Sequence, residues 1–105
     1  MRSRYAAFAL GRYDYIMNTT HHSNPQYQED TVAWAKDLAD FARGTQFLGL
    51  SISEFVDGDD EAFVTFHAEL RQNGHDVSFS ERSRFFKENG AWIYVDGVIL
   101  GAADD

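Results

Sequence analysis

The 105-residue sequence contains no cysteine, only one proline and few basic side chains, and each shortage excludes a class of protein. Without cysteine there is no disulfide framework, no Cys-x-x-Cys redox site and no thiolate zinc site. No apolar run approaches the roughly 18 residues that a membrane-spanning helix needs, so we expect no membrane partner. A chain that folds without disulfides fits the reducing cytoplasm, which is its expected location.

The charge balance is acidic, with 9 basic against 17 acidic side chains and a net charge of −8. Binding to a phosphate backbone requires basic clusters, so we expect no nucleic-acid partner. The sequence also lacks a nucleophile motif and a glycine-rich phosphate loop. The adjacent His21 and His22 diverge on any regular backbone and do not form a metal pair by spacing. We therefore expect no cofactor and no metal.

The pattern of apolar residues changes at Gly44. Before it, apolar residues recur at helical spacing, which predicts helices over Arg2–Leu10, Tyr13–Thr20 and about Glu29–Arg43. The third helix has the clearest apolar stripe, which includes Trp34, and Gly44 ends it.

Beyond Gly44, apolar and polar residues alternate, which is typical of strands. The predicted strands are Thr45–Val56, Glu61–Arg71, Asp76–Lys87 and Ala91–Leu100. Asn73-Gly74 and Asn89-Gly90 separate the last three, and Asn-Gly is the strongest short signal for a tight hairpin. The sheet is therefore predicted to be an antiparallel meander.

Three helices followed by a meander indicate an α+β fold in one domain over residues 1–105. The sheet must curl around the helices to bury Trp34, Leu38 and Phe41. Leu48, Leu50 and Ile52 are expected on one face of the first strand. A curled sheet with helices on its concave side often leaves a pocket at its open end.

MRSRYAAF at residues 1–8, Thr19-Thr20-His21, SERSRFFKENG at residues 80–90 and residues 92–97 are together similar to the YchJ-like family. The resemblance implies a nuclear transport factor 2-like (cystatin-like) fold, in which a cone of curved sheet wraps a long helix. Family members commonly join this domain to short cysteine-rich SEC-C zinc motifs. The chain carries none of these, so we expect a lone-domain member or a trimmed piece. The resemblance implies no established reaction.

Glu81 is the most informative polar residue, because strand alternation puts it on the apolar face with Val77, Phe79 and Phe85. A carboxylate that faces a core is costly unless it is paired or opens into a pocket. We expect a buried ion pair with Arg4, which can project from the first helix. The alternatives are a pocket carboxylate that acts as acid, base or ligand anchor, and a strand bulge that exposes the side chain.

The residues expected at the pocket are Arg4, Tyr5, His21, Trp34 and Glu81. Two functions from different classes fit them. The first is a non-catalytic binding or accessory module for an unknown small-molecule ligand. The second is an acid/base enzyme of the isomerase or dehydratase type, with Glu81 or His21 as general base and a tyrosine, Tyr5 or Tyr94, donating to an oxyanion. His21 could instead only brace its loop through a hydrogen bond.

Arg82, Arg84 and Phe86 point to the outer face of the sheet, and Phe63 belongs to this face too. The simpler interpretation is a solvated surface with cross-strand charge pairs. The alternative is a weak homodimer through this face, with the two phenylalanines supplying its apolar part.

Overall fold

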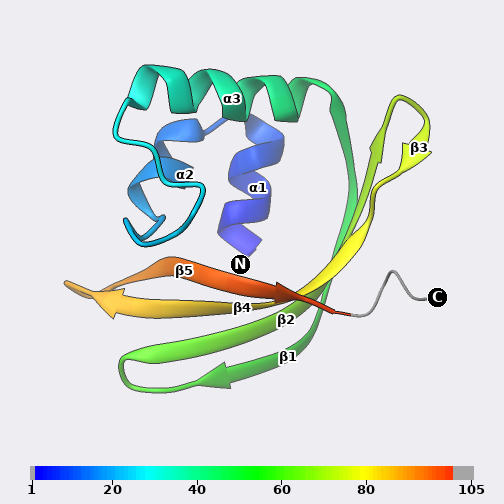
Figure 1. Cartoon of the computed structure of the whole chain (residues 1–105). Helices are drawn as coiled ribbons and strands as arrows, with labels where there is room; N and C mark the ends of the chain where they lie inside the picture. Colours follow the sequence, from blue (N-terminus) through cyan, green and yellow to red (C-terminus); the bar gives the residue numbers. More distant parts are fainter. Residues whose placement is uncertain (1, 101–105) are drawn as a thin grey trace.

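A computed structural model describes residues 2–100, in which three helices pack on the concave side of one antiparallel sheet. The helices are α1 (Arg2–Leu10), α2 (Tyr13–Asn18) and α3 (Thr31–Arg43). The strands are β1 (Thr45–Asp57), β2 (Glu61–Gln72), β3 (His75–Asp76), β4 (Phe79–Glu88) and β5 (Ala91–Ile99). The strand order is β1-β2-β4-β5, and β3 pairs with β2. The predicted α+β fold is confirmed, and Figure 1 shows the sheet curling below the helices and up one side of them.

Helix α3 lies above the sheet (Figure 1). This segment forms a helix because its apolar residues fall on one face and both of its ends are capped. The Asp30 side chain accepts hydrogen bonds from the backbone N–H groups of Val32 and Ala33, so the helix begins just after it rather than at Glu29. Trp34 is only 4% exposed, as predicted. Phe41 is 40% exposed, so the expectation that the curled sheet buries it was wrong. Within residues 2–100, none of the helices is long and apolar enough to cross a membrane.

The hairpin turns are those that the sequence predicts. Asn73 and Gly74 have φ values of 52° and 79°, and Asn89 and Gly90 have values of 51° and 82°. Both residues of each pair therefore occupy the left-handed region that a type I′ turn requires. The first turn makes β2 and β3 antiparallel neighbours, and the second does the same for β4 and β5.

Two irregularities in β1 change which of its residues face the core. The register with β2 shifts between Phe47 and Gly49 and again between Ile52 and Glu54. Leu48 is therefore 54% exposed, and Phe47 packs against the core instead. The prediction that Leu48 shares a face with Leu50 and Ile52 was wrong, because those two pack against the core and strict alternation does not anticipate a β-bulge.

The strand predicted over residues 76–87 is divided in two. At the break, Val77 N–H donates to the Leu70 carbonyl at 3.1 Å, and the Ser78 hydroxyl accepts from Leu70 N–H at 3.0 Å. Because a side-chain oxygen replaces a backbone partner, the ladder is interrupted and β3 contains only two residues.

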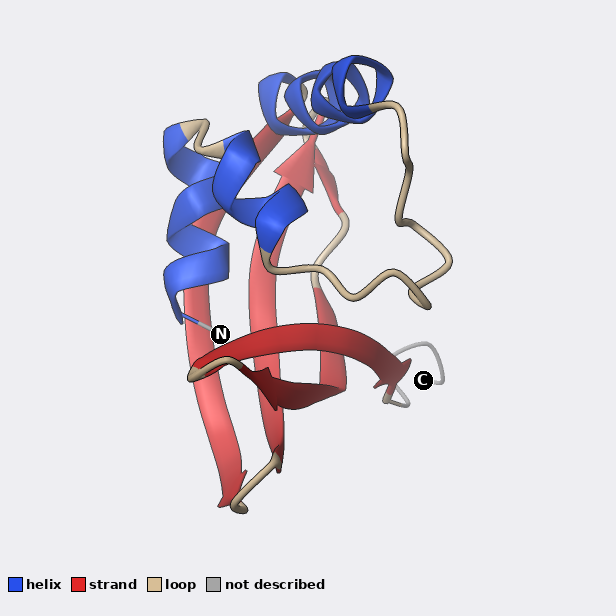
Figure 2. Cartoon of the chain, turned by 90° about the vertical axis from the view of Figure 1, so that its left-hand side faces the viewer, coloured by secondary structure: helices blue, strands red, loops and turns tan. Residues whose placement is uncertain are grey.

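The concave face of β2 carries the core. Its inward residues are all at most 5% exposed, namely Ala62, Val64, Phe66, Ala68 and Leu70. Figure 2 shows α3 nearly end-on above this sheet, with α1 and α2 to one side and the loop from α2 to α3 passing along the other. The helices and this loop stand over the sheet, and the space between them is the site considered next.

Replacing Trp34 by alanine tests how α3 packs. Because the indole is buried, we expect the free energy of unfolding to fall by about 3–5 kcal/mol in urea titrations. Val32→Ala is the matched control, because Val32 lies on the same helix and is 81% exposed. A loss below about 1 kcal/mol for Trp34→Ala would contradict the packing.

Candidate functional site

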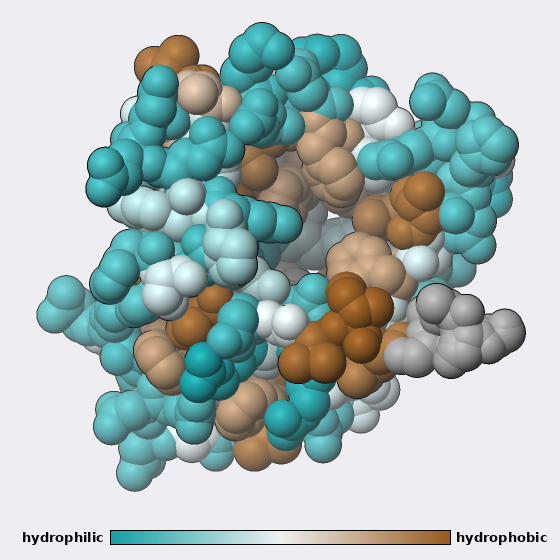
Figure 3. All heavy atoms as spheres, in the orientation of Figure 1, coloured by the Kyte–Doolittle hydropathy of each residue, from teal (hydrophilic) through white to brown (hydrophobic). Residues whose placement is uncertain are grey.

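A cavity of about 660 Å³ lies between the helices and the concave face of the sheet. This volume falls in the range of roughly 300–1,000 Å³ that small-molecule sites occupy. Much of its wall consists of aromatic rings, contributed by Tyr5, Phe8, Trp34, Phe47, Phe66 and Phe79. Figure 3 shows it as a hollow near the centre of the molecule, with apolar side chains along its rim. Of the five residues predicted at the pocket, four line it, and His21 does not.

The carboxylate of Glu81 is held in this cavity by two hydroxyl groups. Its Oε2 atom accepts hydrogen bonds from Ser83 Oγ at 2.6 Å and from Tyr94 Oη at 2.9 Å. Ser83 is completely buried. Among residues 2–100, no group donates a hydrogen bond to the other oxygen, Oε1. The predicted placement of Glu81 on the concave face, among apolar neighbours, is confirmed.

Gly97 on β5 makes room for this carboxylate. It faces Ser83 across the strand pair, beside Glu81 on β4. A Cβ atom at position 97 would overlap the Glu81 carboxylate, so no other amino acid fits without moving the glutamate. Sequence reasoning missed this role, although a glycine inside a strand is a recognised sign of close approach by another group.

Tyr94 is a fixed hydrogen-bond donor rather than a base. Burial raises the pKa of its phenol, and the negative charge of Glu81 raises that pKa further. The hydroxyl therefore stays protonated at physiological pH and directs its hydrogen atom to Glu81. Its ring also packs on Phe85, with 5.7 Å between the centroids.

Arg4 is buried against a face of the Tyr94 ring, and its guanidinium binds the residues at the end of α2. Nη1 donates to the Thr19 hydroxyl at 2.7 Å and the Thr19 carbonyl at 3.1 Å, and Nη2 donates to the Thr20 hydroxyl at 3.2 Å. The guanidinium carbon lies 4.8 Å from the Tyr94 ring centroid. Burial lowers the pKa of Arg4 to about 10, which leaves it charged at neutral pH.

The predicted Arg4–Glu81 ion pair is wrong. The two residues line one cavity, but the guanidinium is directed to the threonines and contacts a face of the tyrosine ring. Threonine oxygens accept from Arg4, and two hydroxyl groups donate to Glu81 Oε2, so the two charged groups have separate partners. Strand and helix periodicity placed both side chains on the inner face, but it does not indicate which partner each one selects.

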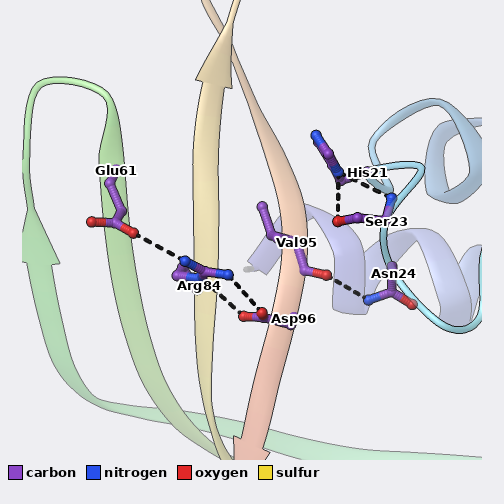
Figure 4. Close-up of polar contacts among 7 residues, drawn as sticks. All are labelled: His21, Ser23, Asn24, Glu61, Arg84, Val95 and Asp96. Atoms are coloured by element: carbon purple, nitrogen blue, oxygen red, sulfur yellow. Dashed lines mark hydrogen bonds and ion pairs between the residues drawn. The ribbon is translucent and has the colours of Figure 1, made fainter.

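His21 braces the loop beside the β4–β5 hairpin. Its Nδ1 atom lies 2.8 Å from Ser23 Oγ, as Figure 4 shows, and its Nε2 atom lies 3.5 Å from an oxygen of Glu88. Its backbone N–H donates to the Tyr94 carbonyl at 2.8 Å. These contacts match the loop-bracing interpretation, and they separate His21 from the cavity that it was predicted to join.

Asn24 is the loop residue that sequence reasoning missed. It is 7% exposed, and its Nδ2 atom donates to the Val95 carbonyl at 2.8 Å (Figure 4). Its Oδ1 atom accepts from Gln26 N–H at 2.8 Å. This amide therefore fixes the loop to β5 and positions Pro25 and Gln26, which line the cavity. The asparagine-proline pair was the available signal, because it marks a turn.

The outer face of the sheet is a network of charge pairs that covers its aromatic rings. Arg84 Nη2 lies 2.7 Å from an Asp96 oxygen, and Nη1 lies 3.5 Å from one of Glu61 (Figure 4). The Arg84 guanidinium also lies over Phe86, 5.0 Å from its centroid. The cross-strand charge pairing expected from the sequence is present. Among residues 2–100, no three acidic or histidine side chains are grouped so that they could hold a metal ion.

A curved antiparallel sheet wrapped around helices, with a cavity inside the cone, defines the class of NTF2-like domains. The chain belongs to the family described as "YchJ, middle NTF2-like domain", which matches residues 1–97. The family resemblance stated from the sequence is confirmed.

Individual relatives agree with this assignment. The chain is 41% identical over 99 residues to UPF0225 protein VP1145 of Vibrio parahaemolyticus, covering 93% of this chain and 56% of that protein. It therefore spans little more than half the length of this curated relative. The solution structure of RPA3114, a SEC-C motif containing protein from Rhodopseudomonas palustris, is 32% identical. It has a TM-score of 0.78 over 95% of this chain and 75% of that chain. A SEC-C motif containing protein from Psychrobacter arcticus is 25% identical, with a TM-score of 0.68 over 95% of this chain and 58% of that chain.

Replacing Arg4 by methionine tests its role in the site. Methionine fills similar space but leaves the threonine oxygens without their charged donor. We expect the free energy of unfolding to fall by about 1.5–3 kcal/mol in urea titrations, the range for hydrogen bonds to charged groups. Arg2→Met is the control, because Arg2 is exposed on the same helix. Equal losses in the two variants would contradict a structural role for Arg4.

Proposed function

We propose that this domain is a non-catalytic binding module whose cone holds a small, mainly apolar molecule. The observation that carries the proposal is the cavity of about 660 Å³, which combines aromatic walls with a carboxylate whose Oε1 atom has no hydrogen-bond donor among residues 2–100. An apolar cavity with a few convergent polar groups is the usual form of a ligand site. The aromatic walls would bind the body of the ligand, and Glu81 would orient it.

The alternative, an isomerase or dehydratase that uses acid/base chemistry, has less support. It needs a base beside the substrate and a hydroxyl that is free to donate to a developing oxyanion. Glu81 meets the first need. The Tyr94 hydroxyl already donates to Glu81, and the Tyr5 hydroxyl oxygen is completely buried, so neither is placed to donate to an oxyanion in the open cavity. His21, the other proposed base, lies outside the cavity. These contacts favour an anchoring role for the carboxylate over a catalytic one.

Three indoles that share one ring and differ in their terminal group test the binding function: tryptophol, tryptamine and indole-3-acetate. We expect at least one of them to shift the backbone amide signals of cavity residues such as Phe66 and Ala68 in two-dimensional NMR spectra. The expected dissociation constant is about 1 mM or tighter, as suits an unoptimised ligand in an apolar cavity.

Leu38→Trp and Val32→Trp form a matched pair of variants for this experiment. Leu38 lines the cavity from α3, so a larger ring there should block it. Val32 lies on the same helix but is 81% exposed, so its substitution should leave binding unchanged. The proposal fails if none of the indoles shifts the cavity signals, or if Leu38→Trp leaves those shifts intact.

We also infer a weak homodimer through the outer face of the sheet, where Arg82 and Arg84 cover Phe63 and Phe86. The supporting observation is that this face also exposes apolar area, because Val98 opposite Arg82 is 65% exposed. A surface that alternates both charges around apolar residues is complementary to a second copy of itself.

Sedimentation equilibrium at high micromolar concentration tests the dimer. We expect a dimer component that Phe86→Glu removes, because the substitution replaces an apolar ring by a charged group that is costly to bury in an interface. A monomer at every concentration, or a dimer that survives the substitution, would contradict this interface.

A further inference from the structure

Among the described residues that line the cavity, negatively charged side chains outnumber positively charged ones. Glu81 lies inside it, and Asp37 lies on the exposed part of its rim, where one carboxylate oxygen accepts a hydrogen bond from Gln28 Nε2 at 2.9 Å. Arg4 supplies the only positive charge among the described residues that line the cavity. The cavity therefore carries two negative groups against one positive group, in a chain whose net charge is −8.

Arg4 does not neutralise the carboxylate directly. Its Nη1 and Nη2 atoms donate to the end of α2, within 2.7–3.2 Å of the threonine oxygens there. Its guanidinium contacts the Tyr94 ring, and the hydroxyl of that ring reaches Glu81. Both charged groups therefore contact Tyr94, and the cation has no donor directed at the Glu81 carboxylate.

Among residues 2–100, the hydrogen bonds of Glu81 leave one of its two carboxylate oxygens without a donor. Both of its donors, Ser83 and Tyr94, are neutral hydroxyls, and both bind Oε2. Oε1 accepts from no group within residues 2–100. A carboxylate in apolar surroundings gains most from a positively charged donor, because such hydrogen bonds are about twice as strong as neutral ones.

We propose that the cavity binds a small organic cation, an ammonium group on an aromatic or apolar body, with the ammonium directed to Glu81 Oε1. This inference rests on the proposed binding function and adds the chemical class of the ligand. The aromatic walls suit such a molecule, because a cation is attracted to the face of a ring and its apolar body is removed from water. Asp37 at the rim adds a negative potential where the ligand enters.

The same three indoles test the charge of the ligand. They have identical rings and carry an ammonium, a hydroxyl or a carboxylate. In NMR titrations of the unaltered chain, we expect tryptamine to bind at least about tenfold more tightly than tryptophol, and indole-3-acetate to bind most weakly. Because this comparison uses only the unaltered chain, it does not depend on whether a variant folds.

The Glu81→Gln variant tests whether Glu81 causes the preference for tryptamine over tryptophol. The variant keeps the size of the side chain and removes its charge, so we expect tryptamine to lose about tenfold in affinity while tryptophol changes little. Glu69→Gln is the matched control, since it makes the same change in net charge on the opposite face of β2. Its tryptamine affinity should equal that of the unaltered chain.

The outcomes separate the two proposals. If tryptophol binds in the cavity as tightly as tryptamine, the binding function stands and the cation class is overturned. The class is also overturned if Glu69→Gln weakens tryptamine as much as Glu81→Gln does. If none of the three indoles binds, the binding function itself fails.

Discussion

The buried guanidinium of Arg4 is the contact on which the rest of this domain depends. It joins α1 to the two residues that follow α2 through the oxygens of Thr19 and Thr20. Thr20 in turn pairs with Tyr94 of β5, so one side chain connects two helices to the edge of the sheet. The loop that follows, secured by Asn24, closes one wall of the cavity. A cation inside a domain of this size is costly unless it is fully bonded, and its partners here are neutral oxygens.

The cavity exists because the sheet curves while the helices span it. Curvature comes from the register shifts in β1 and between Arg84 and Phe85, which twist the strands more than an unbroken ladder would. The concave face then meets α3 near Trp34 and leaves the remaining space lined by rings. Within it, Glu81 is positioned from two strands, by hydroxyls of β4 and β5 and by the absence of a side chain at Gly97.

Local patterns predicted the architecture, and they predicted the site only in part. Helical spacing placed Trp34 in the core, and alternation placed Glu81 on the concave face. Both placements depend only on the helix or strand that carries the side chain, and periodicity predicts the orientation of residues within one element. The partner of Arg4 depends on how three separate elements meet, and no periodicity encodes that. The prediction for Leu48 was wrong for a related reason. A bulge reverses which face of the strand each later residue occupies, and the composition of the strand does not reveal it.

Gly97, which makes room for the Glu81 carboxylate, also constrains how this site can change over evolutionary time. Because a Cβ at position 97 and a glutamate at position 81 require the same space, the two positions cannot vary independently. A lineage that acquires a side chain at 97 first passes through a form with a displaced carboxylate. One that shortens residue 81 first encounters no such obstacle. The order of substitutions is thus set by sterics, and the site is easier to lose through position 81 than through position 97.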